Sequence, residues 1–209
     1  MTEPTENPDP SSPEVAAPDQ PQLPPKKVLL LSAIAGTVVI LDSISKIIVV
    51  ATIQPNQPVR VLGGLVYLSL IRNSGAAFSM ATGLTWLLAL VAIGVVVVII
   101  RMAPRLRSTP WAVSLGLVLG GALGNLIDRI FRSPGFMQGH VVDFVSVFGP
   151  NAEYFPVFNV ADSAITIGGI SLVVTALLGI DFDGTSTRKK KPQAKEPGDL
   201  QAEPKDESA

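Results

Sequence analysis

The chain has 209 residues, of which 47% are hydrophobic and only 16% are charged, with a formal net charge of −1 at pH 7. A typical soluble domain has about 25% charged residues, so this composition indicates a membrane protein. Cysteine is absent and His140 is the single histidine, which excludes disulfides, cysteine catalysis and a multi-histidine metal site.

Both ends of the chain are polar and lack the periodic apolar residues that a packed domain needs. Residues 1–25 are acidic and rich in proline, and residues 181–209 combine acids with a basic run. Segments of this composition are typical of disorder. We therefore expect two disordered tails, at 1–25 and 181–209, and one membrane domain at 26–180 between them.

Four apolar stretches are long enough to cross a membrane as helices, which takes about 20 residues. They are, in chain order, Val28–Ile53, Leu84–Ile100, Trp111–Ile130 and Val157–Ile180. The first follows a long acidic tail, and its apolar run exceeds that of a typical signal peptide. The sequence therefore predicts an α-helical integral membrane protein with four transmembrane helices.

Basic residues flank these spans unevenly. Lys26 and Lys27 precede the first span, three arginines lie between the second and third, and a basic run follows the fourth. Cytoplasmic loops are richer in lysine and arginine, so we expect both termini in the cytoplasm. The segments 54–83 and 131–156 would then face outward.

The outward segment 54–83 is predicted to have structure of its own. VRVLGGLVYLSLI at 59–71 is rich in β-branched residues around a Gly-Gly pair, which predicts one or two short strands joined by a turn. A long loop with such a β element is usually functional. The segment 131–156, which contains FRSPGF and FGPN, is instead predicted to be rich in turns.

Four aspartates come from different segments and reach a similar depth. At 1.5 Å per residue, Asp42 and Asp128 lie about 22 Å and about 25 Å from the inner ends of their spans. Asp143 precedes the fourth span, and Asp162 lies near its outer start. Because ionisable groups inside a membrane are costly, each aspartate is a candidate functional residue.

Two of these aspartates have a basic neighbour at helical spacing. Lys46 follows Asp42 by four residues, and Arg132 follows Asp128 by four. Each pair can form a local ion pair, so a purely structural role stays open for both aspartates.

The other two aspartates have no lysine or arginine between them or within four positions of either. If Asp143 and Asp162 were brought together, they would share one proton, as the catalytic pair of an aspartic protease does. The alternative is that Asp162 is an N-terminal helix charge capped by Asn159, while Asp143 is a solvated loop acid.

Five motifs occur in order along the chain. They are DSISK at 42–46, IRNSGAAFS at 71–79, GGALGNLIDRI at 120–130, HVVDFV at 140–145 and FNVADSAITIG at 158–168. Together they resemble the bacterial lipoprotein signal peptidases (signal peptidase II) over about residues 28–180. The resemblance implies an intramembrane aspartic endopeptidase that removes signal peptides from diacylglyceryl-modified prolipoproteins, cutting before the lipidated cysteine.

The same resemblance assigns the site. It implies that Asp143 and Asp162 are catalytic and that no metal or other cofactor takes part. The supporting or substrate-binding residues that it implies are Asp42, Lys46, Asn73, Gly75, Asn125, Asp128, Arg129 and Asn159. Ala76 and Ala77 would leave room for a lipidated cysteine. Ser43 departs from the family pattern, which usually has the longer glutamine there.

Several of these residues have expected roles. The Asn73 amide would bond the substrate backbone, and Arg129 would bond backbone carbonyls or lipid phosphate. Asn125 and Asp128 share a helix face and would orient the loop that carries Asp143. Asn159 would bond the catalytic pair or the substrate. The glycines at 120–121, 124 and 168–169 are predicted to make close helix contacts.

Other kinds of membrane protein compete with a peptidase. A small transporter or channel subunit also carries intramembrane acids, but its path would need polar residues at several depths, and the inner halves of these spans are apolar. A structural scaffold would have no reason to gather four acids at one depth. A serine or rhomboid-type protease is excluded because the single histidine lies in a loop.

Together with the four spans, the resemblance implies a multi-pass peptidase of a bacterial inner (plasma) membrane, with its active site near the outer face. Its expected partners are prolipoprotein substrates and membrane lipids. Nothing in the sequence implies nucleic acid or an obligate protein partner.

Overall fold

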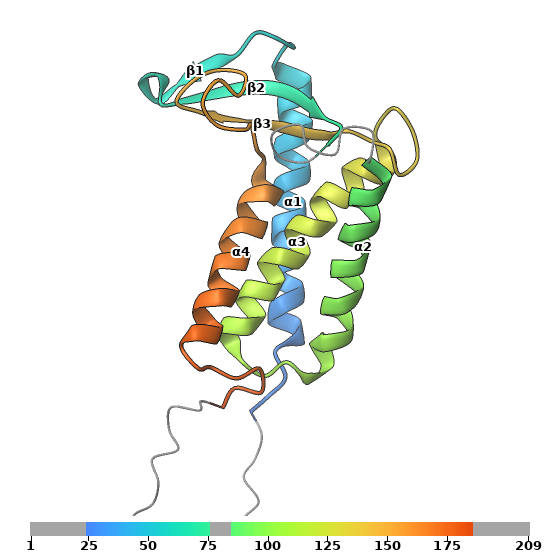
Figure 1. Cartoon of the computed structure of the whole chain (residues 1–209), viewed down its shortest axis with the longest axis vertical. Coiled ribbons are helices and arrows are strands. Elements are labelled where there is room, and N and C mark those ends of the chain that lie inside the picture. Colours follow the sequence, from blue (N-terminus) through green and yellow to red (C-terminus); the bar gives the residue numbers. More distant parts are fainter. Residues whose placement is uncertain (1–23, 76–84, 186–209) are drawn as a thin grey trace, which may run out of the picture.

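The computed structural model describes residues 24–75 and 85–185. Within these residues four long helices run side by side (Figure 1). They are α1 (Val28–Thr52), α2 (Thr85–Met102), α3 (Thr109–Phe131) and α4 (Val160–Leu177). Each is long and apolar enough to cross a membrane, which confirms the four predicted spans.

Helix α3 lies at the centre of the bundle, where it packs against α1, α2 and α4. In its most apolar stretch 56% of the residues are buried, against 22% in each of the other three helices. Large side chains on the outer helices, such as Ile47, Val98 and Ile167, are instead more than half exposed. These apolar outer faces suit contact with lipid.

Glycines allow the close approach of α3 to its neighbours. A Cβ at Gly120 would lie 2.8 Å from the backbone oxygen of Ala35 in α1, and one at Gly168 would lie 2.8 Å from that of Ser114 in α3. The predicted close contacts are therefore confirmed at both glycines. The prediction is wrong for Gly169, which faces open space because the next residue of a helix points to another side.

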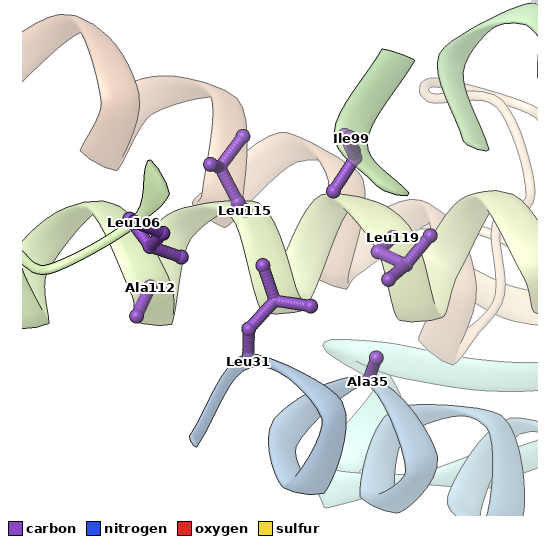
Figure 2. Packing of buried hydrophobic residues seen from close by; sticks show 7 residues of the cluster. All are labelled: Leu31, Ala35, Ile99, Leu106, Ala112, Leu115 and Leu119. Carbon is purple, nitrogen blue, oxygen red and sulfur yellow. The ribbon is translucent and has the colours of Figure 1, made fainter. Parts of the chain in front are cut away.

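Apolar side chains from α1, α2, α3 and the connection between α2 and α3 pack together in the part of the bundle farther from the sheet (Figure 2). The buried members of this cluster are Leu31, Ala35, Ile99, Leu106, Ala112, Leu115 and Leu119. Phe182, from the segment after α4, packs against the cluster, and its ring centroid lies 5.7 Å from that of Trp111. Residues 181–185, which the sequence assigns to the C-terminal tail, thus lie against the bundle.

A small antiparallel sheet lies across the other end of the bundle (Figure 1). Its strands are β1 (Val59–Val61), β2 (Val66–Asn73) and β3 (Val141–Val147), in the order β1-β2-β3, and the short 3-10 turn η1 (Leu62–Gly64) joins the first two. A second such turn, η3 (Ala103–Arg105), follows α2. The strands at 59–71 are confirmed.

Segment 131–156, predicted to be rich in turns, also contains strand β3, which was not predicted from the sequence. The strand pairs with β2 so that Asp143 lies opposite Ile71. Phe144 anchors the strand by packing against Val49 and Ile53 at the end of α1. The segment before α4 is also extended, because Phe158 pairs with Val145, so the fourth helix begins at Val160 and not at the predicted Val157.

Candidate active site

A cavity of about 650 Å³ lies where the sheet meets the helices. Its lining includes six of the residues predicted from the sequence, from β2 and the residues after it, α3, β3 and α4: Asn73, Gly75, Asn125, Arg129, Asp143 and Asp162. Its apolar lining comes from Leu88, Phe155, Val157, Ile165 and Ile167, among others. The cavity thus has a polar wall and a larger apolar wall.

Asp143 and Asp162 come from different elements, and Asn159 bonds both of them. The Asn159 side-chain nitrogen donates to Asp143 Oδ1 at 2.7 Å, and its backbone nitrogen donates to Asp162 Oδ2 at 3.2 Å. Asn159 Oδ1 in turn accepts from the Asp162 backbone nitrogen at 2.9 Å, which completes a capping box at the start of α4. Asp162 is therefore a helix-cap residue and a neighbour of Asp143 at once.

Two further amides bond the same carboxylates. Asn73 Nδ2 donates to Asp143 Oδ2 at 2.8 Å, and Asn125 Nδ2 donates to Asp162 Oδ1 at 2.7 Å. Every carboxylate oxygen of the pair therefore accepts a hydrogen bond. Asn73 Oδ1 also accepts from the Gly75 backbone at 2.9 Å. The Asn73 amide, expected to bond a substrate, thus bonds Asp143 and Gly75 here.

Asp143 is only 2% exposed. Burial, followed by the nearby charge of Asp162, raises the pKa of Asp143 from 3.8 to about 7. Hydrogen bonds from Asn73 and Asn159 and the charge of Lys46 oppose this rise in pKa. Asp143 therefore holds a proton over most of the range below neutral pH, as a general acid requires.

Basic residues lie near the pair in space although none lies near it in sequence. Arg129 of α3 is buried, and the charges of both Asp143 and Asp162 act on it. Its Nη2 donates to the Gly75 backbone oxygen at 3.0 Å, while its buried Nη1 has no hydrogen-bond partner among the described residues. Ala76, expected to leave room for a lipidated cysteine, lies outside the described residues, as does Ala77.

The predicted helical ion pairs form behind the cavity. Lys46 Nζ lies 2.7 Å from Asp42 Oδ2, and Arg132 pairs with Asp128. Lys46 also lies 2.9 Å from Asp128 Oδ2 and 3.1 Å from Asn125 Oδ1. These last two contacts join α1 to α3, and spacing along one helix gives no sign of them.

A model of the family described as signal peptidase (SPase) II matches residues 34–178 of the chain. The chain belongs to the signal peptidase II family. It is 58% identical to a lipoprotein signal peptidase of Rhodococcus jostii (strain RHA1) over 173 residues, covering 83% of this chain and 84% of the relative. It is 52% identical to that of Mycobacterium avium (strain 104), covering 83% of this chain and 92% of the relative.

The fold of this family member is also similar to solved structures. One is a bacterial membrane enzyme determined by the in meso method at 2.3 Å resolution, with a TM-score of 0.68 and 28% identity. The match covers 83% of this chain and 99% of that chain. Family and fold together confirm the resemblance seen in the five motifs, and they make the chain a membrane-embedded peptidase.

The apolar lining of the cavity was not predicted from the sequence. An apolar residue of a span that faces a cavity looks the same, in sequence, as one that faces lipid. The signal available was spacing: Ile165 follows Asp162 by three residues and so shares its helix face. Leu88 lies far from Asp162 along the chain, and Phe155 lies in the connection before α4, seven residues before Asp162, where no helical spacing marks it.

Proposed function

We propose that Asp143 and Asp162 are the catalytic pair with which this signal peptidase II removes signal peptides from lipoproteins. The observation that carries the assignment is that one residue, Asn159, bonds both carboxylates on the wall of one cavity. The motifs and the absence of basic neighbours in sequence point to the same two residues.

The surroundings of the two carboxylates suit different roles in general acid–base catalysis. Asp162 lies in the first turn of α4, where the helix N-terminus favours a negative charge, so it accepts the proton of the attacking water. Asp143, with its pKa raised to about 7, donates its proton to the oxygen of the scissile carbonyl. In the second step Asp162 gives its proton to the nitrogen of the leaving amine, and Asp143 takes back a hydroxyl proton from the tetrahedral intermediate. The C–N bond breaks, a carboxylic acid and an amine form, and both aspartates return to their starting states.

The lining of the cavity is consistent with a lipid-modified substrate. Leu88, Ile165 and Ile167 form an apolar wall beside the carboxylates. Such a wall suits acyl chains and an apolar signal peptide segment. The proposed substrates are therefore diacylglyceryl-modified prolipoproteins, cut before the lipidated cysteine.

The proposed orientation places both termini in the cytoplasm. Among the described basic residues, Lys26, Lys27, Arg101, Arg105 and Arg107 lie at the ends of the spans remote from the sheet, and the sequence adds a basic run after the fourth span. The sheet end has fewer, namely Arg60, Arg72, Arg129 and Arg132. Because basic residues are more numerous on the cytoplasmic side, the sheet and the catalytic pair would lie near the outer face of the membrane.

The test is to replace each aspartate in the purified enzyme. We expect Asp143→Asn and Asp162→Asn each to lower kcat for a lipidated precursor by about 10²- to 10⁴-fold, because each removes one partner of the proton transfer. Cleavage is followed by gel shift, and folding by thermal unfolding in detergent. The matched control is Glu153→Gln, which should keep normal activity. Glu153 is an exposed acid that lies between Asp143 and Asp162 in the sequence. A folded Asp143→Asn or Asp162→Asn enzyme with near-normal kcat would refute the assignment.

A further inference from the structure

A buried lysine stands behind the catalytic pair and makes three polar contacts. Lys46 Nζ lies 2.7 Å from Asp42 Oδ2, 2.9 Å from Asp128 Oδ2 and 3.1 Å from Asn125 Oδ1. Asn125 Oδ1 accepts a hydrogen bond from the ammonium group, and the two carboxylates form ion pairs with it. Lys46 and Asp42 are each 1% exposed, and neither they nor Asp128 line the cavity. The cluster therefore acts on the site without touching the space that a substrate would fill.

The two carboxylates that meet Lys46 also hold the backbone at two particular places. Asp42 Oδ1 accepts from the backbone nitrogen of Ala161 at 3.0 Å. Asp128 Oδ2 accepts from the backbone nitrogen of Val142 at 3.1 Å. Ala161 immediately precedes Asp162, and Val142 immediately precedes Asp143. Each carboxylate thus fixes the peptide group next to one of the proposed catalytic aspartates.

Lys46 also determines which way the Asn125 amide points. Two donors, Lys46 Nζ and Asn159 Nδ2, both lie 3.1 Å from Asn125 Oδ1. If the amide turned over, its NH₂ group would face both donors, and its oxygen would face Asp162 Oδ1. The amide is therefore held with its nitrogen 2.7 Å from Asp162 Oδ1.

Stability alone is a weak explanation for this cluster. Buried ion pairs lose much of their hydration, and well-packed apolar residues of similar volume often serve stability equally well. Apolar residues, however, accept no hydrogen bond from Ala161 or Val142 and would not orient an amide. The charged cluster instead orients specific groups: the backbone amides just before the two proposed catalytic aspartates and the side-chain amide of Asn125.

We propose that Lys46 is a positioning residue for catalysis: it ties together the carboxylates that hold the backbone before Asp143 and before Asp162, and it orients Asn125 toward Asp162. This inference rests on the catalytic role proposed above for the two aspartates. Loss of Lys46 should then reduce the rate of the chemical step and leave substrate binding nearly unchanged.

The decisive variant is the double substitution Asp42→Asn with Lys46→Met. It removes one positive and one negative charge together, and Asp128 keeps Arg132 as its partner. The introduced asparagine would retain an oxygen for the Ala161 amide, so the variant is designed to fold. We expect kcat for a lipidated precursor to fall by about 10²-fold, the effect of a small misplacement of reacting groups, with KM nearly unchanged.

The pH profile gives a readout that a merely structural role would not move. The groups whose charges act on Asp143 include Asp162 and Lys46, and Arg129 lies close by. Of the two residues that the double variant neutralises, Lys46 is the one whose charge is among the causes that lower the pKa of Asp143, so its removal should let activity persist to a higher pH. We therefore expect the alkaline limb of kcat to move upward in the double variant.

Ser171→Ala is the matched control. Ser114 Oγ donates to Ser171 Oγ at 2.9 Å, which also joins α3 to α4, but at a distance along the bundle from the catalytic pair. Loss of this hydrogen bond in Ser171→Ala should lower Tm or leave it unchanged. In either case kcat and the pH profile should stay the same. A second probe is Gly124→Ala, whose new Cβ would lie 2.6 Å from Asp42 Oδ2 and should displace that carboxylate. It should reduce kcat in the same way.

The outcomes separate the two proposals. If the double variant and Gly124→Ala keep normal kcat while Asp143→Asn and Asp162→Asn are inactive, the positioning role is wrong and the catalytic assignment stands. If Ser171→Ala loses as much kcat as the double variant for the same fall in Tm, the positioning role is also wrong. An active Asp143→Asn enzyme would instead remove the catalytic assignment.

Discussion

Asp143 and Asp162 carry the same side chain in different surroundings. Asp162 is partly exposed and sits in a capping box at the N-terminus of α4, where a charged carboxylate is favoured. Asp143 lies in β3 and is buried, and its pKa rises to about 7. Asp143 is therefore the proposed proton donor, and kcat should fall as the pH rises through about 7.

The raised pKa of Asp143 also predicts how stability changes with pH. Its folded pKa of about 7 exceeds its ordinary value of 3.8, so between these pH values the folded state binds more protons than the unfolded state. The stabilising contribution is therefore complete at low pH and is lost as the pH rises toward 7. In Asp143→Asn this loss is absent, so Tm should decline less between pH 5 and pH 8.

Thermal unfolding in detergent at several pH values measures this difference. Glu153→Gln is exposed and should keep the slope of the unchanged enzyme. Equal slopes for Asp143→Asn and the unchanged enzyme would mean that Asp143 titrates normally in the folded state.

Residue spacing predicted the local contacts of the site and missed the distant ones. The pairs Asp42–Lys46 and Asp128–Arg132 follow from i,i+4 spacing and are confirmed. The contact of Lys46 with Asp128 joins two helices, so it depends on how those helices pack. For the same reason the sequence shows no basic group near Asp143, whereas folding brings Arg129 and Lys46 within electrostatic reach.

At the scale of elements, the helices were predictable and the third strand was not. A membrane span is marked by its own length and hydropathy, whereas a strand depends on a partner that can lie far away in sequence. VVDFVSV is rich in β-branched residues, which is a strand signal, but the turns around it dominated the prediction. Because β3 pairs with β2, it carries Asp143 at a fixed register opposite Ile71.

The contact between α3 and α4 predicts different effects for two adjacent glycines. A Cβ at Gly168 would lie 2.8 Å from the Ser114 backbone oxygen and 2.8 Å from Val118 Cγ2, while Gly169 faces open space. Gly168→Ala should therefore lower stability by about 1–3 kcal/mol through overpacking. Gly169→Ala should leave Tm unchanged or slightly higher, because alanine favours helix by about 1 kcal/mol over glycine. Thermal unfolding of the two variants in one detergent tests this, and an equal loss of Tm would contradict it.

The whole molecule has two dissimilar ends. Buried carboxylates, amides and Lys46 gather near the sheet. The part of the bundle farther from the sheet contains the apolar cluster around Leu115, which Figure 2 shows. A transport path would need polar groups at several depths between α1, α2 and α3. The apolar cluster closes that space, so the arrangement favours a site that is reached from one side of the membrane.

The difference between the two ends predicts how the enzyme is oriented in the membrane. Because the chain has no cysteine, a single introduced cysteine reports on one position alone. Phe136, in the connection between α3 and β3, is 75% exposed at the sheet end, and Asp183 is exposed at the opposite end. With basic residues marking the cytoplasmic side, Phe136→Cys should react with a membrane-impermeant thiol reagent in right-side-out vesicles. Asp183→Cys should react only after the vesicles are opened. The reverse pattern would place the catalytic pair near the cytoplasm and would contradict the proposed outer location of the active site.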